Sequence, residues 1–331
     1  MATITLSSGR SFETTSEKSI LDAAAQANVA LPYSCRTGRC STCRCKVISG
    51  LTTALNPETG LTELERAEGW ILSCTRAAET DLVLDVDDLG GLILPTPKTL
   101  PCRINEIVHL APDVIQVFLR LPPTADFEFT PGQYVDVIGP NGIHRSYSLA
   151  NGSFADKVLE LHIRSVDGGE FSEYWFKQAK PNDLLRIHGP LGTFFLRNTA
   201  NIDLVFLATG TGIAPVKSIL ESLPRLKQDE NPKSITVLWG GRKPADLYFD
   251  VSQIPGNFTF IPVLSRPDRS WKGQAGYVHD VLLKTIPNLQ NAAVYACGST
   301  AMIHSAKAKL TQASLPSSRF YSDAFVSSGT T

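Results

Sequence analysis

Four of the seven cysteines stand at spacings that could hold a metal centre. Cys35, Cys40 and Cys43 follow the pattern C-x4-C-x2-C, and Cys74 lies much further along the chain. This is the plant-type [2Fe–2S] pattern, in which one loop supplies three thiolates and a distant cysteine supplies the fourth. The loop consists mostly of small or flexible residues, and Gly38 gives its backbone the freedom to approach the cluster sulfurs. The cysteines therefore predict a centre that carries one electron at a time.

Two other uses of these cysteines fit the sequence less well. A zinc site made of four cysteines usually has two C-x2-C pairs, and this chain has only one. Seven is an odd number of cysteines, and the chain opens with no charged-then-apolar leader, so we do not expect the disulfides of an exported protein. Cys45 and Cys102 are expected to be small buried thiols.

Two motifs in the middle of the chain have the residue types that bind a pyrophosphate. Arg145–Ser148 places an arginine beside small hydroxyls, and Gly168–Ser172 is a glycine turn that should open a helix. Guanidinium groups, backbone amides and a helix amino end are all donors to phosphate. Tyr147 adds a flat face for a ring system. The string R-x-Y-S is also compatible with an ordinary surface strand that carries an arginine. The other motifs of the chain therefore decide whether it is a binding site.

Two further motifs follow apolar strands. Thr209–Pro215 comes directly after the apolar run 204–208, at the edge where open α/β sheets bind nucleotides. It is not the G-x-G-x-x-G fingerprint, because residue 215 is proline. Cys297 and Gly298 are expected just after the strand 294–296. A tight turn is the ordinary interpretation there, but a small soft side chain would also suit a position beside reacting rings.

Length and composition limit the classes of protein. A chain of 331 residues allows two or three domains, and 43% hydrophobic residues with a formal net charge of −1 are typical of a globular protein. Without a strong charge, nucleic acid and anionic membranes are poor partners. No apolar run approaches the ~18 residues of a membrane span, so we expect a cytoplasmic protein. The six histidines show no H-x-x-x-H pair, and we expect most of them to be structural.

The pattern of elements predicts three domains that position these motifs: 1–92, 99–200 and 201–331. The first reads as a small α+β module, with Ser19 and the T-x-x-E box at Thr62 and Glu65 as helix starts. The second has short alternating strands, which predict an antiparallel barrel. The third alternates apolar strands with helical segments, which predict a parallel α/β sheet with helices on both faces. The predicted strands are 4–6, 12–14, 82–86, 114–119, 159–164, 204–208, 235–239, 258–263 and 293–296.

The order of the motifs resembles the ferredoxin–NADP reductase superfamily from about residue 100 to the end. The resemblance rests on 131–133 (PGQ), 145–148, 189–194 (GPLGTF), 209–215 and 297–299. With a plant-type [2Fe–2S] ferredoxin domain in front, the chain is similar to iron–sulfur flavoprotein reductases of multicomponent enzymes. The resemblance implies a β-grasp ferredoxin domain, an FAD-binding β-barrel and a nicotinamide-binding α/β domain.

The resemblance also implies roles for single residues. Ser148, near flavin N5, Cys297, beside the nicotinamide, and Asp323, near the hydride path, would be catalytic. Phe325 corresponds to the aromatic residue that covers the flavin, although here the sequence continues beyond it to Thr331. The FAD contacts would be Arg145, Ser146, Tyr147, Ser148, Arg164, Gly168, Gly169 and Ser172, and the nicotinamide dinucleotide contacts Thr209, Gly210, Thr211, Gly212, Gly240, Arg242, Cys297 and Gly298.

A flavin is the natural converter between a hydride, which carries two electrons, and a cluster, which accepts one. We therefore expect an NADH-dependent oxidoreductase that passes electrons through FAD and the cluster to a partner enzyme. NADPH stays open, because Arg266 and Lys272 could meet a 2′-phosphate.

The strings 190–195 and 320–326 resemble reductases that serve a CDP-4-keto-6-deoxyhexose 3-dehydrase in deoxysugar synthesis. The alternatives are the reductase component of a ring-hydroxylating oxygenase and, in another class, a redox sensor or carrier. Arg36, Arg39 and Arg44 near the cysteines would suit an acidic face on the partner, although solvated loop charges are the ordinary interpretation.

Overall fold

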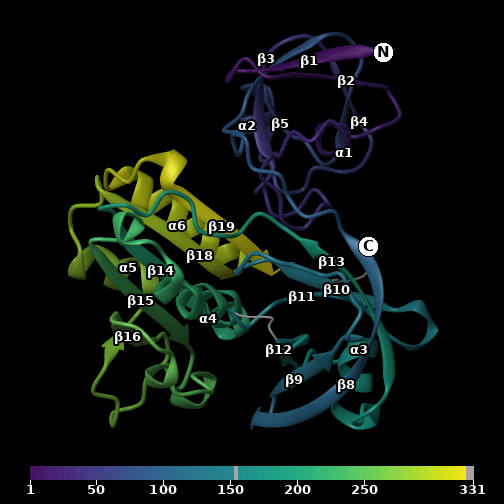
Figure 1. The fold of residues 1–331 in the computed structure, drawn as a ribbon. Helices are drawn as coiled ribbons and strands as arrows, with labels where there is room; N and C mark the ends of the chain where they lie inside the picture. The colour runs from purple at the N-terminus through teal and green to yellow at the C-terminus, as the bar shows by residue number, and fades with distance from the viewer. Residues whose placement is uncertain (153–155, 326–331) are drawn as a thin grey trace. The chain divides into compact units, whose positions relative to one another are not determined.

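The chain folds into two compact units. One unit joins Met1–Pro95 to the described residues 323–325, and the other is Thr96–Ser322. The computed structural model describes residues 1–152 and 156–325 (Figure 1). Within these ranges no helix combines the length and the apolarity that a membrane span requires. The predicted division at residue 200 stays a prediction, because the contacts group residues on both sides of it into one unit.

The first unit contains a mixed five-stranded sheet in the order β2-β1-β7-β3-β5. The central strands β1 and β7 are parallel, and β2 and β3 pair with them antiparallel. Alternate residues such as Ile4, Leu6 and Leu84 are buried in a core that also contains Ile20 of α1. The elements are β1 (Ala2–Leu6), β2 (Ser11–Thr14), α1 (Ile20–Gln26), β3 (Arg44–Ser49), β4 (Thr52–Ala54), α2 (Glu63–Ala67), β5 (Trp70–Leu72), β6 (Arg76–Ala78) and β7 (Leu82–Asp85).

Both predicted helix starts of this unit are confirmed. The Ser19 hydroxyl accepts a hydrogen bond from the Asp22 amide at 3.0 Å and caps α1. Thr62 and Glu65 form a reciprocal capping box at α2, with a Thr62 amide to Glu65 carboxylate distance of 2.9 Å. In the sequence, α1 precedes the cysteine loop and α2 follows it. The two caps therefore fix where the loop begins and where β5, which leads to Cys74, can start.

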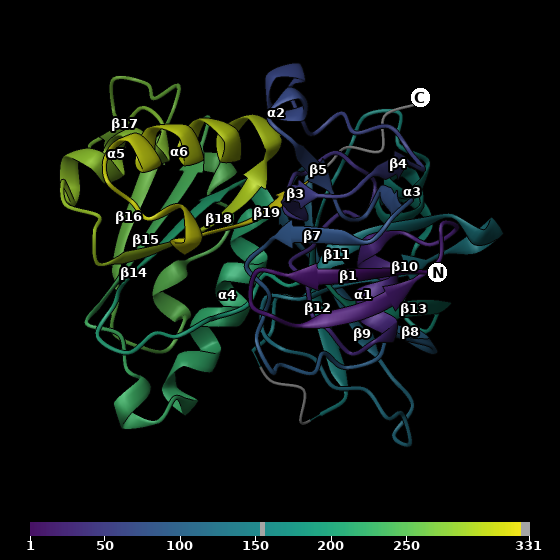
Figure 2. The same ribbon diagram turned by 90° about the horizontal axis from the view of Figure 1, so that it is seen from above.

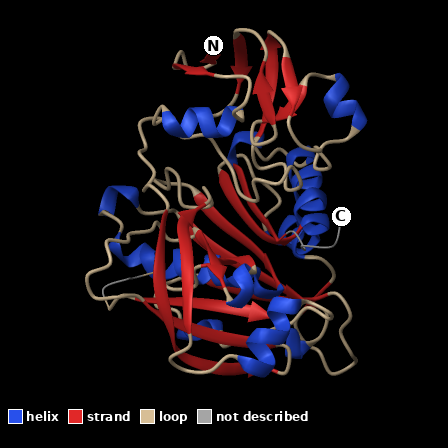
Figure 3. Cartoon of the chain, turned by 90° about the vertical axis from the view of Figure 1, so that its right-hand side faces the viewer, coloured by secondary structure: helices blue, strands red, loops and turns tan. Residues whose placement is uncertain are grey.

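The second unit begins with a six-stranded antiparallel sheet in the order β11-β10-β13-β8-β9-β12. A bridge between Leu149 and Leu161 joins the two edges of this order and closes the sheet into a barrel. Figure 3 shows its strands in red around the barrel core. The elements are β8 (Lys98–Ala111), β9 (Val114–Arg120), β10 (Tyr134–Ile138), β11 (His144–Ser148), β12 (Val158–Arg164), α3 (Glu170–Glu173) and β13 (Leu184–Leu191).

The rest of this unit is an α/β sheet in the order β17-β16-β15-β14-β18-β19. Its strands β14, β15, β16 and β18 run parallel, and α4 lies on the face opposite to α5 and α6 (Figure 2). The prediction of helices on both faces is therefore confirmed. The elements are β14 (Asp203–Thr209), α4 (Ile213–Ser222), β15 (Ser234–Gly241), β16 (Thr259–Leu264), β17 (Gln274–Ala275), α5 (Val278–Thr285), β18 (Ala292–Ser299), α6 (Thr300–Gln312) and β19 (Phe320–Phe325).

One local expectation needs correction. Cys297 and Gly298 were expected after a strand, but both lie within β18 because ladder pairing with β14 continues to Cys297. The helix expected after the Gly168–Gly169 turn is present as the short α3, and a π-helix over Tyr174–Gln178 continues it.

Candidate functional site

The four spaced cysteines lie in the structure as two pairs of free thiols. The Sγ atoms of Cys43 and Cys74 are 3.3 Å apart, and the Cys35 amide donates to Cys40 Sγ at 3.5 Å. The described part of the chain contains no group of three or more His, Cys, Asp or Glu side chains suited to a single metal ion. Two pairs instead fit a centre in which each of two irons takes two thiolates, as in a [2Fe–2S] cluster.

Each pair contains one thiol that ionises readily and one that does not. The hydrogen bond from Cys40 lowers the pKa of Cys35 to about 5, and the same contact together with burial raises the pKa of Cys40. Likewise the bond from Cys43 lowers the pKa of Cys74, while that bond and burial raise the pKa of Cys43. Metal binding requires the thiolate form of each cysteine ligand, so loading a metal would release the protons that these pairs hold.

The cysteine loop is packed too closely to admit a side chain at Gly38. Its φ is +74°, and a Cβ there would lie 2.3 Å from the Pro57 carbonyl oxygen. Cys45 lies apart from the pairs, and burial raises its pKa to about 12. Cys102 in the barrel is also buried, as expected, and its pKa is raised to about 12 by burial.

The arginines near the cysteines are partly neutralised within the chain. Arg36 pairs with Asp22, and Arg44 pairs with Glu65 and lies with its guanidinium 4.2 Å from the centre of the Trp70 ring. These contacts reduce the positive charge that the sequence alone indicated. An acidic docking face on the partner is therefore not supported by these two side chains.

The predicted flavin motifs are brought together by β10, β11 and the segment that follows β13. Ser148 and Tyr147 at the end of β11 pair with Tyr134 and Val135 of β10. The Gln133 side chain donates to the Gly192 carbonyl at 3.0 Å. Three of the resembling strings, 131–133, 145–148 and 189–194, thus meet at one end of the barrel.

The side chains of these motifs have defined environments. Ser148 is buried, and the Tyr147 hydroxyl accepts a hydrogen bond from Trp175 Nε1 at 3.0 Å. Burial raises the pKa of Tyr147, so the phenol stays protonated. Ser146 donates to Asp136 at 2.5 Å, and Arg145 Nη1 donates to the His144 carbonyl at 2.7 Å.

The glycine turn before α3 is closed by its own hydrogen bonds. Gly168 has φ +69°, and the Gly169 amide donates to the Val166 carbonyl at 2.9 Å. The Ser172 hydroxyl accepts from the Val166 amide at 3.0 Å. The turn is therefore preformed at the end of the segment that follows β12.

Arg164 lies between the barrel and the first nucleotide motif. Its guanidinium is 3.9 Å from the point that a Cβ on Gly210 would occupy, and its Nε is 3.6 Å from Asp113. Within the described ranges, its buried Nε and Nη2 have no hydrogen-bond partner. Buried guanidinium donors ordinarily have acceptors, so this position fits a bound group that carries oxygen atoms.

The two predicted nicotinamide motifs touch each other. A Cβ on Gly212 would lie 2.3 Å from the Cys297 carbonyl oxygen, and one on Gly298, whose φ is +149°, would lie 2.1 Å from Thr209 Oγ1. Trp239 donates its indole N–H to the Gly210 carbonyl at 2.9 Å. Backbone packed this closely requires glycine at both positions, and the turn lies at the carboxyl end of β14, where open α/β sheets bind nucleotides.

The remaining predicted positions occupy the ends of β15 and β19. Gly240 pairs with Thr209, and Arg242 is exposed with its amide donating to Asp246 Oδ2 at 2.7 Å. Asp323 is buried and accepts a hydrogen bond from Ser34, next to Cys35, at 2.5 Å. Phe325 is half-buried at the end of the described residues. The role predicted for Phe325 stays a prediction.

Sequence reasoning missed a buried polar cluster around Glu160, His162 and Lys217. The alternation in 159–164 was the available signal, because it places Glu160, His162 and Arg164 on one face of a strand. This segment was predicted as a strand with Arg164 as a flavin contact, and most histidines were expected to be structural, so neither Glu160 nor His162 was singled out.

Three family models match successive parts of the chain. The 2Fe-2S iron-sulfur cluster binding domain matches residues 4–79, the oxidoreductase FAD-binding domain residues 101–196, and the oxidoreductase NAD-binding domain residues 206–308. These matches confirm the predicted cofactors as a [2Fe–2S] cluster, FAD and a nicotinamide dinucleotide.

Comparison with whole proteins agrees with these matches. The chain is 41% identical over 325 residues to CDP-6-deoxy-L-threo-D-glycero-4-hexulose-3-dehydrase reductase of Yersinia pestis, covering 97% of each. It is 32% identical over 319 residues to terephthalate 1,2-dioxygenase reductase component 1 of Comamonas sp., covering 95% of this chain and 94% of the relative. The crystal structure of an Amycolatopsis cytochrome P450 reductase superposes with a TM-score of 0.76 at 29% identity, covering 98% of this chain and 99% of that one.

Proposed function

We propose that this chain, which belongs to the iron–sulfur flavoprotein reductases, delivers electrons from NADH to a 3-dehydrase that acts on a CDP-4-keto-6-deoxyhexose. One observation carries the choice of acceptor. The identity to the dehydrase reductase of Yersinia pestis is 41% across nearly the whole chain, against 32% to the terephthalate dioxygenase reductase component. The match to the dehydrase reductase covers 97% of this chain, so it is not confined to the cofactor motifs.

The cysteine pairs supply the iron ligands in this proposal. Cys35 with Cys40 and Cys43 with Cys74 would each hold one iron, and Gly38 lets the loop backbone lie close to the cluster. When bound, the flavin accepts a hydride and the cluster transfers single electrons. The task of the loop is to hold three of the four thiolates in place, with Cys74 supplying the fourth from beyond β5, and to exclude bulky side chains.

The barrel and the α/β sheet supply the remaining contacts. Arg145 and the Gly168–Ser172 turn would bind the FAD pyrophosphate, and the Ser148 hydroxyl would lie near flavin N5. Arg164, with unfilled buried donors, would bind oxygen atoms of a cofactor. The turn Thr209–Gly212, packed against Cys297, would position the nicotinamide.

NADH fits the adenosine end of the site better than NADPH. Arg242, the arginine expected there, has its Nε 3.3 Å from an Asp246 carboxylate that also accepts from the Arg242 and Lys243 amides. The Arg242 side chain together with these backbone hydrogen bonds lowers the pKa of Asp246, although burial opposes the shift. The Arg242 guanidinium is therefore already paired with a carboxylate, which leaves less positive charge for a 2′-phosphate.

The test measures acceptor choice with the purified full-length protein. NADH consumption is followed under anaerobic conditions with a purified 3-dehydrase and its CDP-sugar substrate, and separately with an oxygenase component. We expect turnover with the dehydrase at least about tenfold faster. Faster turnover with the oxygenase component would contradict the proposal and favour the alternative, the reductase component of an oxygenase. The 32% identity to the terephthalate dioxygenase reductase supports that alternative.

A further inference from the structure

One face of β12 is polar and yet buried. Leu159, Leu161 and Ile163 point into the barrel core, as strand alternation requires. The opposite face carries Glu160 and His162, which are each only 6% exposed. Charged residues on the outer face of a barrel strand ordinarily meet water, so another part of the chain must cover them.

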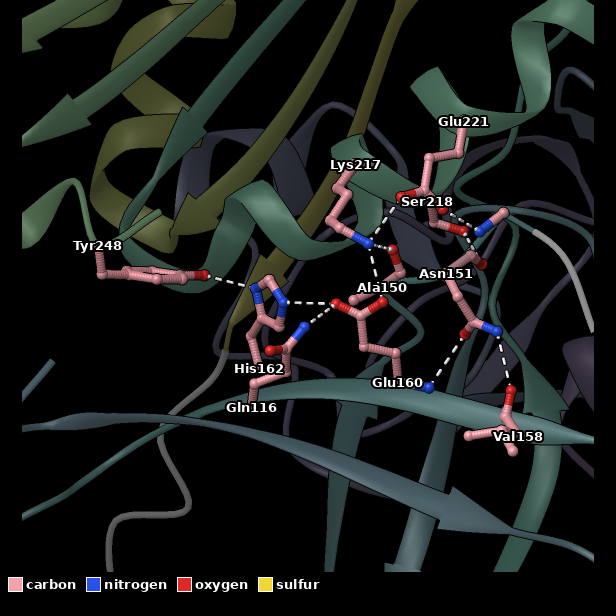
Figure 4. Close-up of polar contacts among 11 residues, drawn as sticks. Gln116, Ala150, Asn151, Val158, Glu160, His162, Lys217, Ser218, Glu221 and Tyr248 are labelled. Carbon is pink, nitrogen blue, oxygen red and sulfur yellow. Dashed lines mark hydrogen bonds and ion pairs between the residues drawn. The ribbon is translucent and has the colours of Figure 1, made fainter. Parts of the chain in front are cut away.

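The covering groups come from the α/β part of the same unit. Lys217 of α4 donates to Glu160 Oε2 at 2.8 Å and to the Ala150 carbonyl at 3.2 Å. The Tyr248 hydroxyl lies 2.9 Å from His162 Nδ1. Figure 4 shows these side chains converging from α4, β12 and the loop that carries Tyr248.

The hydrogen bonds fix the protonation states in the cluster. His162 Nε2 lies 2.9 Å from Glu160 Oε1, which also accepts from the Gln116 amide at 2.7 Å. Burial lowers the pKa of His162, so its contact with Glu160 is a hydrogen bond of neutral imidazole. Burial would raise the pKa of Glu160, but the bond from His162 and the charge of Lys217 hold it at about 2. Tyr248 therefore donates to His162 Nδ1.

A second set of contacts ties α4 to the segment after β11. Ser218 donates to the Asn151 carbonyl at 2.8 Å, and Glu221 accepts from the Gly152 amide at 2.8 Å. Asn151 Oδ1 in turn accepts from the Glu160 amide at 3.0 Å. The anchored segment follows Ser148 directly in the sequence.

The cluster also reaches the nucleotide turn through Tyr248. The Tyr248 ring packs edge-on against Trp239 with ring centres 5.1 Å apart. Trp239 donates to the Gly210 carbonyl, and α4 with Lys217 begins at Ile213, directly after the same turn. Two contact routes thus join the turn Gly210–Gly212 to β12.

We propose that Lys217, Glu160, His162 and Tyr248 form a latch that fixes the nicotinamide-binding turn against the flavin-binding strands for hydride transfer. These are positioning residues, and the proposal rests on the cofactor roles proposed above for Thr209–Gly212 and Ser148. Hydride transfer requires reacting atoms roughly 3–3.5 Å apart, and a displacement of about 1 Å can cost about 100-fold in rate. A buried ion pair contributes little net stability compared with apolar packing, so its value here lies in defining one geometry.

The test uses Lys217→Met in the purified full-length protein. Flavin reduction by NADH is followed anaerobically by stopped flow without any acceptor, so a wrong assignment of the acceptor does not affect the result. We expect the limiting rate to fall at least tenfold, while the apparent Kd for NADH changes less than threefold. Electron transfer from photoreduced flavin to the cluster should keep its rate. The control is Lys233→Met, whose Nζ is exposed and 3.8 Å from Asp203.

A second variant keeps the test decisive if Lys217→Met binds no FAD. Glu160→Gln preserves the shape of the side chain and removes its charge, and it should lower the same limiting rate. In the double variant the limiting rate should fall only as far as in the more affected single variant, because both substitutions break the same contact between Lys217 and Glu160. A lower melting temperature with an unchanged limiting rate in these variants would show that the cluster only stabilises the fold, and the proposal would be wrong.

Discussion

Gly212→Ala should separate the two nucleotide motifs by a measurable amount. The added Cβ would lie 2.3 Å from the Cys297 carbonyl oxygen and 3.0 Å from the Gly298 nitrogen. The φ of Gly212 is −60°, which alanine adopts without strain, so the effect is purely steric. Both neighbours are backbone atoms of β18, and no side-chain rotation can relieve the contact.

The magnitude follows from the distances. Comfortable contact between a carbon and another heavy atom begins near ~3.5 Å, so the turn and β18 must move apart by roughly 1 Å. A shift of this size at the hydride donor costs about 100-fold in rate, equivalent to about 2.7 kcal/mol of activation free energy. Overpacking should also lower the free energy of unfolding by about 1–3 kcal/mol.

Stopped-flow reduction of the flavin by NADH measures this rate directly. Gly91→Ala serves as the control, because a Cβ there would meet only Arg10 Nη2 at an ordinary 3.7 Å. A Gly212→Ala protein that retains FAD and is reduced within threefold of the wild-type rate would refute the idea that this turn positions the nicotinamide.

Three further predictions concern other parts of the chain. Cys74→Ser should abolish the visible absorbance of the cluster and leave the flavin spectrum, whereas Cys45→Ser should leave both, because only Cys74 belongs to a thiol pair; retained cluster absorbance in Cys74→Ser would contradict the ligand assignment. Burial lowers the pKa of His162, so below about pH 6.5 the unfolded chain binds a proton there that the folded chain does not. The free energy of unfolding therefore falls by up to about 1.4 kcal/mol for each pH unit below that value. His162→Gln should therefore show a flatter decline of Tm between about pH 7.5 and 5.5, and parallel curves for the two proteins would contradict the burial argument. Asp246→Asn should raise kcat/KM for NADPH relative to NADH by about tenfold in steady-state assays, equivalent to about 1.4 kcal/mol, because Arg242 loses its carboxylate partner and becomes free to meet a 2′-phosphate; an unchanged ratio would place the 2′-hydroxyl elsewhere.

Local signals account for what the sequence predicted well. The C-x4-C-x2-C spacing, the Ser19 cap and the Thr62–Glu65 box each act within one short segment, and the structure contains the helix starts as expected. The glycines of Thr209–Gly212 and Gly298 were predicted by their position after apolar strands. Their mutual contact follows from the parallel pairing of β14 with β18, which the alternation of elements also indicated.

Long-range polar contacts account for what the sequence missed. Glu160 and Lys217 belong to different predicted domains, and each alone resembles an ordinary solvent-facing charge. The pairing of Arg36 with Asp22 and of Arg44 with Glu65 likewise depends on tertiary packing, so the charge near the cysteines was overestimated. Hydrophobic periodicity predicts which face is apolar but not what covers the polar face.

The proposed electron transfer requires one chain to hold a two-electron carrier and a one-electron carrier together. Anaerobic reductive titration of the purified protein, followed by absorbance and electron paramagnetic resonance, counts these electrons. We expect about three electron equivalents per chain, two in FAD and one in a cluster with the paramagnetic signal of a reduced [2Fe–2S] centre. An end point at two equivalents, with no such signal after NADH addition, would contradict the proposed pairing of the two carriers.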